Sequence, residues 1–173
     1  FGLSLKQGRK VSTLIAESFP ATMELALAAA CFAVMVGIPL GVYTALRRGK
    51  PLAQLAMAVS LVGVSLPTFL IGILLIMVFA VNLQWLPSNG RGEVLQLGFW
   101  STGLHSWESA RYLILPAITL SLFQLALILR LVRSEMLEVL RTDYIKFARA
   151  RGLPERVVHF SHALRNTLVP VIT

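Results

Sequence analysis

The chain has 173 residues, of which 56% are hydrophobic and 14% are charged, and its mean hydropathy is +0.74. Soluble domains usually carry about 25% charged residues, so this composition excludes an ordinary soluble globular protein. The single cysteine excludes an intrachain disulfide framework. The net charge of +8 is compatible with nucleic-acid binding. We expect no nucleic-acid partner, however, because the basic residues adjoin apolar segments long enough to cross a membrane.

Three long stretches contain no charged residue: 25–46, 51–90 and 112–129. About 20 mostly apolar residues suffice for a helix to cross the hydrocarbon core of a bilayer. We therefore predict an all-α fold, a polytopic bundle of membrane helices in direct contact with the lipid bilayer. The expected parts are spans at 21–46, 52–81 and 112–132, a loop at 82–111, a second loop at 141–165 and the start of a further span at 166–173. Because the last segment is too short to cross, we expect residues 1–173 to be one membrane domain that is a fragment of a larger subunit.

The first predicted span contains residues that favour close packing and bending. Gly37 and Gly41 are small enough to let membrane helices approach one another, and Pro39 between them favours a kink. Pro20 suits the first turn of a helix, so we expect the span to begin there. Residues 12–19 are then expected to form a separate short amphipathic helix at the membrane surface.

The second predicted span is longer than a bilayer requires. Residues 52–81 would form roughly 45 Å of helix at 1.5 Å per residue, against ~30 Å for the hydrocarbon core. We expect tilt, projecting ends or a kink at Pro67 to absorb the excess. Ser65 and Thr68 supply hydroxyls that can satisfy the backbone groups freed by the proline.

Basic residues are distributed unevenly among the connecting segments. Arg47, Arg48 and Lys50 follow the first span, and the segment 133–165 is also basic, whereas the loop at 82–111 carries no net charge. Loops rich in lysine and arginine remain on the cytoplasmic side of a membrane. We therefore expect both basic segments in the cytoplasm and the 82–111 loop outside it.

The 141–165 loop is predicted to contain two short helices. Asp143 favours the start of the first helix and the arginines up to Arg151 favour its end. Gly152 suits the position just after a helix, and Pro154 suits the first turn of the next one. The second helix, 154–164, is expected to carry an apolar stripe made by three residues: Val157, Phe160 and Leu164.

Two interpretations of this helical pair follow from its residues. It can be a docking element held by a cytosolic protein, or a surface loop whose arginines bind lipid phosphates. A third use of the same segment is a metal site, since Glu155, His159 and His162 fall on one helix face. That would make the chain a membrane-embedded metalloenzyme, but nearby arginines oppose a cation and we expect no metal or cofactor. A purely structural membrane scaffold is a further alternative.

No residue pattern indicates catalysis by this chain. A phosphate-binding GxxxxGK[ST] loop is absent from the sequence, so any ATP must be bound by another protein. No catalytic Ser-His-Asp set or pair of carboxylates stands at a credible spacing, and we expect the chain not to be an enzyme. Polar residues within the spans are candidates for lining a solute pathway, with hydrogen bonding between helices as the competing role. These candidates are Ser65, Thr68 and Gln124, with Ser60 and Glu24 as weaker ones.

A resemblance to a known family narrows these alternatives. The pattern Ala148-x-x-x-Gly152, followed by an apolar-basic run to Leu168-Val-Pro170, resembles the cytoplasmic "EAA" loop of permeases from binding-protein-dependent ABC importers. The string from Asp143 to Gly152, and the string from His162 to Pro170, are similar to the dipeptide, oligopeptide and nickel subgroup. Lys146 and Phe147 stand where the broader family has glutamate and alanine, and Arg165 stands where it commonly has proline.

The resemblance implies a fold like that of type I ABC importer permeases, in the inner membrane of a bacterium or archaeon. It implies transport of peptides or related small solutes, with ATP hydrolysed by separate cytoplasmic subunits. The other implied partners are a second permease subunit and an extracytoplasmic solute-binding protein. The first loop helix would be a coupling helix seated on an ATPase subunit. Its expected docking residues are Tyr144, Phe147, Ala148, Arg149, Arg151 and Gly152, the last as a pivot.

Overall fold

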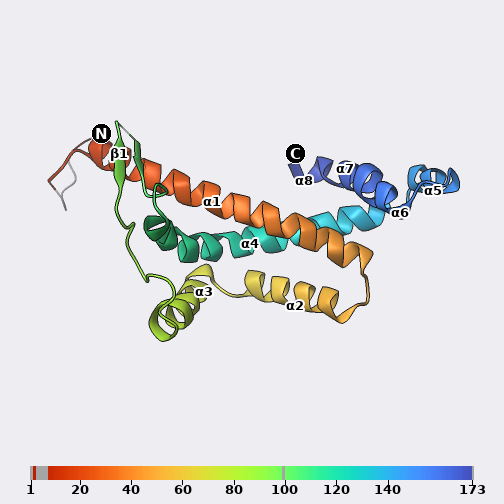
Figure 1. The fold of residues 1–173 in the computed structure, drawn as a ribbon, viewed down its shortest axis with the longest axis horizontal. Helices are drawn as coiled ribbons and strands as arrows, with labels where there is room; N and C mark the ends of the chain where they lie inside the picture. The colour runs from red at the N-terminus through yellow and green to blue at the C-terminus, as the bar shows by residue number, and fades with distance from the viewer. Residues whose placement is uncertain (1, 3–7, 99, 173) are drawn as a thin grey trace. The chain divides into compact units, whose positions relative to one another are not determined.

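The computed structural model describes residues 2, 8–98 and 100–172. The chain divides into two compact units, each assembled from segments that are distant in sequence. Unit 1 comprises Phe1–Cys31 and Pro67–Ser121, and unit 2 comprises Phe32–Leu66 and Leu122–Thr173. The helices α1 (Val11–Leu46) and α4 (Trp107–Val139) each contribute to both units (Figure 1). The architecture is helical, as the sequence predicts.

Both α1, with 36 residues, and α4, with 33, are long and apolar enough to cross a membrane. A pair of helices, α2 (Pro51–Ser65) and the helical stretch Thr68–Asn82, is also long and apolar enough to cross a membrane if the two form one broken span. That stretch consists of α3 (Thr68–Leu75) and the π-helix η1 (Ile76–Asn82). The predicted spans 21–46 and 112–132 lie within α1 and α4, and their positions in a bilayer stay predictions.

The expectation that a helix starts at Pro20 is wrong, and so is the separate helix at 12–19. A single helix, α1, begins at Val11 and continues through Pro20, which is buried. Proline inside a helix removes one backbone hydrogen bond. The carbonyl that loses its helical donor is that of Ala16, four residues earlier.

The second apolar run is broken at Pro67 rather than tilted as one long helix. Leu66 has extended backbone angles, φ −90° and ψ 139°, and separates α2 from α3. A residue before proline is disfavoured in the α conformation by the proline ring. Ser65 Oγ donates to the Leu61 carbonyl at 2.9 Å and so stays within its own helix.

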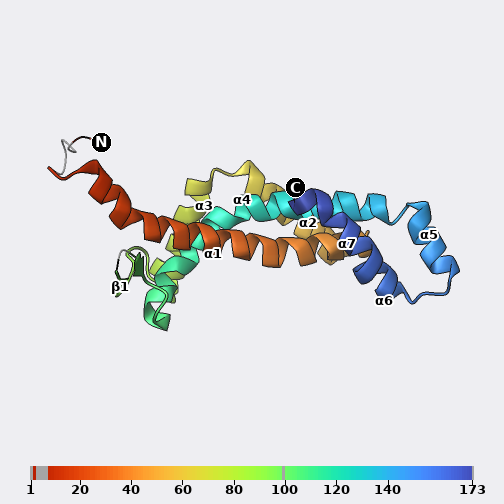
Figure 2. The same cartoon turned by 90° about the horizontal axis from the view of Figure 1, so that it is seen from above.

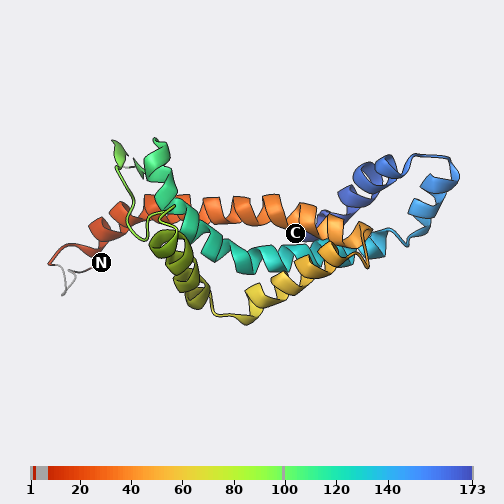
Figure 3. The same cartoon turned by 60° about the horizontal axis from the view of Figure 1, so that its bottom comes forward.

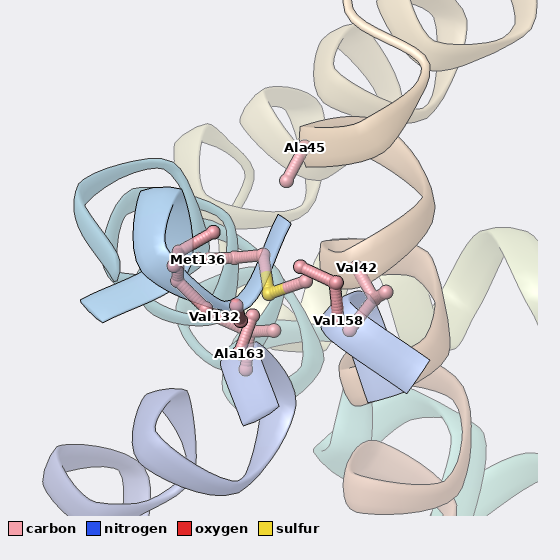
Figure 4. Close-up of a cluster of buried hydrophobic side chains, with 8 residues drawn as sticks. Val42, Ala45, Val132, Met136, Val158 and Ala163 are labelled. Carbon is pink, nitrogen blue, oxygen red and sulfur yellow. The ribbon is translucent and has the colours of Figure 1, made fainter. Parts of the chain in front are cut away.

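Unit 2 is held together by a buried apolar cluster (Figure 4). We name it the junction cluster. Its members come from α1, α4, α5 (Asp143–Ala150) and the π-helix η2 (Val158–Ala163). They are Val42, Ala45, Val132, Met136, Ile145, Ala148, Val158 and Ala163.

The close approach of α1 and α4 within unit 2 depends on glycine. A Cβ atom added at Gly41 would lie 2.7 Å from Val132 Cβ, and one added at Gly37 would lie 3.0 Å from Ile128 Cγ2. The predicted role of these glycines in close helix packing is thereby confirmed. Arg133 Nη1 also donates to the Thr44 carbonyl at 2.7 Å, which satisfies one of the acceptors left free at the end of α1.

Unit 1 contains the segment predicted as a loop at 82–111. Its middle forms an antiparallel hairpin of β1 (Leu95–Leu97) and β2 (Trp100–Thr102), with Leu95 paired to Thr102. The helix α4 begins inside the predicted loop, at Trp107. The hairpin is a small β addition to the predicted all-α fold.

Candidate functional site

The candidate docking segment is a helical hairpin in unit 2 (Figures 2 and 3). After α5 the chain turns at Gly152, and a second helical stretch follows. It consists of α6 (Glu155–Val157), η2 and α7 (Leu164–Thr167), and α8 (Val169–Ile172) comes next. The predicted order of helix, glycine turn and helix is confirmed; the last residue of the expected span start, Thr173, lies outside the described residues.

The turn has the hydrogen bonds of a Schellman motif. Gly152 has φ +76°, a left-handed conformation that side-chain-bearing residues adopt at a cost. Its N–H donates to the Arg149 carbonyl at 2.9 Å, and the Leu153 N–H donates to the Ala148 carbonyl at 3.4 Å. Gly152 therefore ends α5, as the sequence predicts.

The inner face of α5 is buried in the junction cluster. Ile145 has no exposed surface and Ala148 is 5% exposed. Ala148 is expected from the sequence to touch an ATPase subunit, but in this structure it packs against the chain's own core. Its small side chain lets α5 lie close to the junction cluster.

The outer face of α5 is aromatic and basic. Tyr144 is 49% exposed and Phe147 is 64% exposed. The guanidinium carbon of Arg151 lies 5.8 Å from the centroid of the Phe147 ring, a cation–π geometry. We call Tyr144, Phe147 and Arg151 the aromatic face of α5. An exposed aromatic pair beside an arginine is typical of protein-binding surfaces.

Two polar contacts tie α5 to the helix that follows. Arg149 donates from Nε to Glu155 Oε1 at 2.9 Å and from Nη2 to Glu155 Oε2 at 3.3 Å. The Tyr144 hydroxyl hydrogen bonds to His162 Nδ1, and the two rings meet edge to face with centroids 5.5 Å apart. The hairpin is thus held by side chains on both helices as well as by its turn.

The same contacts argue against the predicted alternative of a metal site. Glu155 Oε2 lies 2.9 Å from His159 Nε2, but His162 is paired with Tyr144 instead of joining them. Within the described part of the chain, no three histidine, cysteine, aspartate or glutamate side chains gather as metal ligands. The metalloenzyme hypothesis is therefore not supported.

The apolar stripe predicted for the second helix is only partly correct: Leu164 packs on the junction cluster and Val157 is half-buried. The buried residues there are Val158, Ala163 and Thr167, whereas Phe160 is 57% exposed. The reason is the π-helix η2, whose wider turn places residues five apart on one face. A prediction that assumes 3.6 residues per turn therefore misses Val158 and Ala163.

The candidate pathway residues are exposed in this structure. Among the described residues, the Thr68 and Gln124 side chains make no hydrogen bond, and the Ser65 hydroxyl donates to a carbonyl of its own helix. Their contact with a solute stays a prediction.

Sequence reasoning missed the partners of Glu24, a carboxylate within the apolar α1 helix. Glu24 is 9% exposed. Its carboxylate accepts hydrogen bonds from Trp100 Nε1 and the Gly103 N–H, each at 3.4 Å, and lies 3.8 Å from Arg91 Nη2. We call these four residues the Glu24 cluster. An isolated acidic residue in an apolar helix is a signal for such a site, but it does not name the partners.

The chain is similar to known proteins along most of its length. Residues 37–173 match the family model described as "Binding-protein-dependent transport system inner membrane component". The di/tripeptide transport system permease protein DppB of Pseudomonas aeruginosa is 49% identical over 168 residues, which is 90% of this chain and 50% of that protein.

Two further relatives match nearly the whole chain. The oligopeptide transport system permease protein OppB of Salmonella typhimurium is 39% identical, covering 100% of this chain and 52% of OppB. The dipeptide transport system permease protein DppB of Escherichia coli is 37% identical, covering 99% and 55%. The chain thus spans about half the length of the curated relatives it matches. It belongs to the family of inner membrane components of binding-protein-dependent transport systems, the permeases of ABC importers.

Proposed function

We propose that this chain forms part of the transmembrane pathway of an ATP-driven importer of peptides or related small solutes. Family membership supports a transport role, and the three relatives described above are named as permeases for di/tripeptides, oligopeptides and dipeptides. The proposed orientation places the turn after α1 and the helical hairpin in the cytoplasm, and the β1–β2 hairpin outside.

The observation that carries the proposal is the two-sided character of α5. Its inner face, with Ile145 and Ala148, is buried in the junction cluster, while its outer face exposes Tyr144 and Phe147. Two exposed aromatic rings beside an arginine, on a helix whose other face is packed on the core, favour a surface that a partner protein covers. We infer that a cytoplasmic ATP-binding subunit covers the aromatic face.

The junction cluster gives a physical route from that contact to the membrane helices. The cluster combines side chains of α5 and η2 with Val42 and Ala45 of α1 and with Val132 and Met136 of α4. Packed side chains deform little, so a displacement of α5 would shift the ends of both long helices rather than be lost locally. ATP-driven closure of the partner subunits would in this way reorient the pathway.

The remaining partners follow from the family. A second permease subunit would complete the pathway, and an extracytoplasmic binding protein would deliver the solute. Ser65, Thr68 and Gln124 are proposed to line the pathway. Arg149 is engaged in the ion pair with Glu155. Of the two arginines expected to dock, we therefore assign the direct contact with the ATP-binding subunit to Arg151.

The test is a substitution on the aromatic face of the full permease, assembled with its partners. We expect Phe147→Asp to abolish uptake of a labelled dipeptide while the protein remains in the membrane, because a desolvated carboxylate would oppose docking. Phe147→Leu is the matched control and should retain most uptake, since it keeps an apolar contact. Normal uptake with Phe147→Asp would refute docking through this face.

A further inference from the structure

Unit 2 contains a cleft that does not include the aromatic face of α5. Its volume is about 670 Å³, and it lies between the end of α1 and the helix after Gly152. Its walls are mainly apolar and include Val42, Tyr43 and Leu46 from α1 and Phe160 and Leu164 from the second helix. Phe160 is 57% exposed. We call this the Phe160 cleft.

The charged residues around this cleft are predominantly basic. Arg47 lines it, and the exposed residues Arg48 and Lys50 lie in the same turn. No ion pair joins these three cations to a carboxylate in the described part of the chain. The other basic lining residue, His159, already contacts Glu155, which also accepts from Arg149. Arg47 is therefore the cation available to a ligand.

A second cleft of about 640 Å³ adjoins the first, because Pro39 and Tyr43 line both. Its lining carries no charged side chain. Leu52, Leu55 and Val59 of α2 line it while remaining 58–59% exposed. A pair of apolar clefts with a cationic edge complements an amphiphile that has two hydrocarbon chains and an anionic head.

We propose that an anionic phospholipid of the cytoplasmic leaflet binds here. Its phosphate lies at Arg47 with Arg48 and Lys50 nearby, one acyl chain lies in the Phe160 cleft and the other enters the cleft beside α2. Basic pockets between membrane helices at the cytoplasmic side favour such headgroups. Free phosphate would leave the apolar walls exposed to water, so the lipid is the better match. The choice of leaflet rests on the orientation given under the proposed function.

This lipid would touch both α1 and the second helix of the docking hairpin. It would fill the space beside the junction cluster, where Val42 belongs to the cluster and also lines the Phe160 cleft. Anionic lipid is therefore expected to stabilise the hairpin against α1.

The experiment uses the full permease purified with its partner subunits, and mass spectrometry of the phospholipids that remain bound. We expect Arg47→Gln to reduce bound phosphatidylglycerol about fivefold, the effect of one basic residue at an anionic membrane surface. Bound phosphatidylcholine should not change. Arg141→Gln, at an exposed position outside the cleft, is the matched control and should retain the lipid.

A second measurement addresses the apolar walls. A photoreactive side chain at position 160 should crosslink to phosphatidylglycerol in nanodiscs. Crosslinks only to protein, from this chain or from a partner, would show that the clefts are filled by helices and would overturn the proposal. Unchanged phosphatidylglycerol in Arg47→Gln would do so as well. Neither readout needs transport, so failure here is distinguishable from failure of the proposed function.

Discussion

Arg149 and Glu155 form a two-point ion pair across the Gly152 turn, with N–O distances of 2.9 and 3.3 Å. The Arg149 side chain is 40% exposed and that of Glu155 is 59% exposed, so the pair contributes little to stability, about 0–1 kcal/mol. Its geometric effect is larger, because a bidentate contact fixes the angle between the two helices. The pair therefore makes α5 part of a defined hairpin.

Breaking this ion pair should impair the coupling of ATP hydrolysis to uptake more than it lowers the stability of the fold. We expect Glu155→Gln to lower the free energy of unfolding by less than about 1 kcal/mol and to raise the ATP hydrolysed per dipeptide imported. The measurement is the ratio of ATPase activity to uptake in reconstituted vesicles. The charge swap Arg149→Glu with Glu155→Arg should restore the ratio. An unaltered ratio in Glu155→Gln would show that the ion pair is not needed to couple ATP hydrolysis to uptake.

Substitution of Gly152 should destabilise the protein through its backbone conformation and not through a steric clash. An added Cβ meets no atom within 4 Å, but φ is +76°, so Gly152→Ala is expected to cost about 1–2 kcal/mol from the left-handed conformation. Gly152→Asn should cost less, because asparagine tolerates that region. Thermal unfolding of the purified permease checks the order, and equal melting temperatures for the two variants would contradict it.

Close packing of α1 on α4 predicts a steric effect at Gly41. Gly41→Ala places a Cβ 2.7 Å from Val132 Cβ and should destabilise unit 2 by about 1–3 kcal/mol through overpacking. Val132→Ala in the same chain should relieve only part of this, because it removes Cγ1 at 2.8 Å but keeps Cβ, and the Leu129 carbonyl oxygen at 2.9 Å also remains. Gly63→Ala is the control, since its nearest atom would be the Leu122 carbonyl oxygen at 3.6 Å. Denaturant unfolding of these three variants and the parent tests the argument.

The Glu24 cluster should hold the β1–β2 hairpin against α1. Glu24→Ala leaves the Trp100 and Gly103 donors without their acceptor, which costs about 1–3 kcal/mol for buried groups. Glu24→Gln keeps one acceptor oxygen and should cost less. Hydrogen exchange at residues 100–103 measures the effect, and we expect the fastest exchange in Glu24→Ala. Equal protection in both variants and the parent would mean that other contacts hold the hairpin.

Local chemistry in the sequence is sufficient to predict several features. Runs without charge predict the long helices, because a bilayer core excludes charged side chains over about 20 residues. Gly152 predicts the end of α5 because glycine readily adopts the left-handed conformation found there. Pro67 marks the break between α2 and α3 because proline disfavours a helical conformation in the residue before it. The motif around Ala148 and Gly152 also identifies the family.

Other features were decided by tertiary structure. Ala148 faces the junction cluster and Glu24 meets Trp100 and Gly103, although Gly103 is 79 positions away in sequence. The π-helix η2 shifts the buried face to Val158 and Ala163. These outcomes depend on which distant segments pack together. Periodicity and single-residue preferences describe only near neighbours along the chain, and therefore contain no information about such contacts.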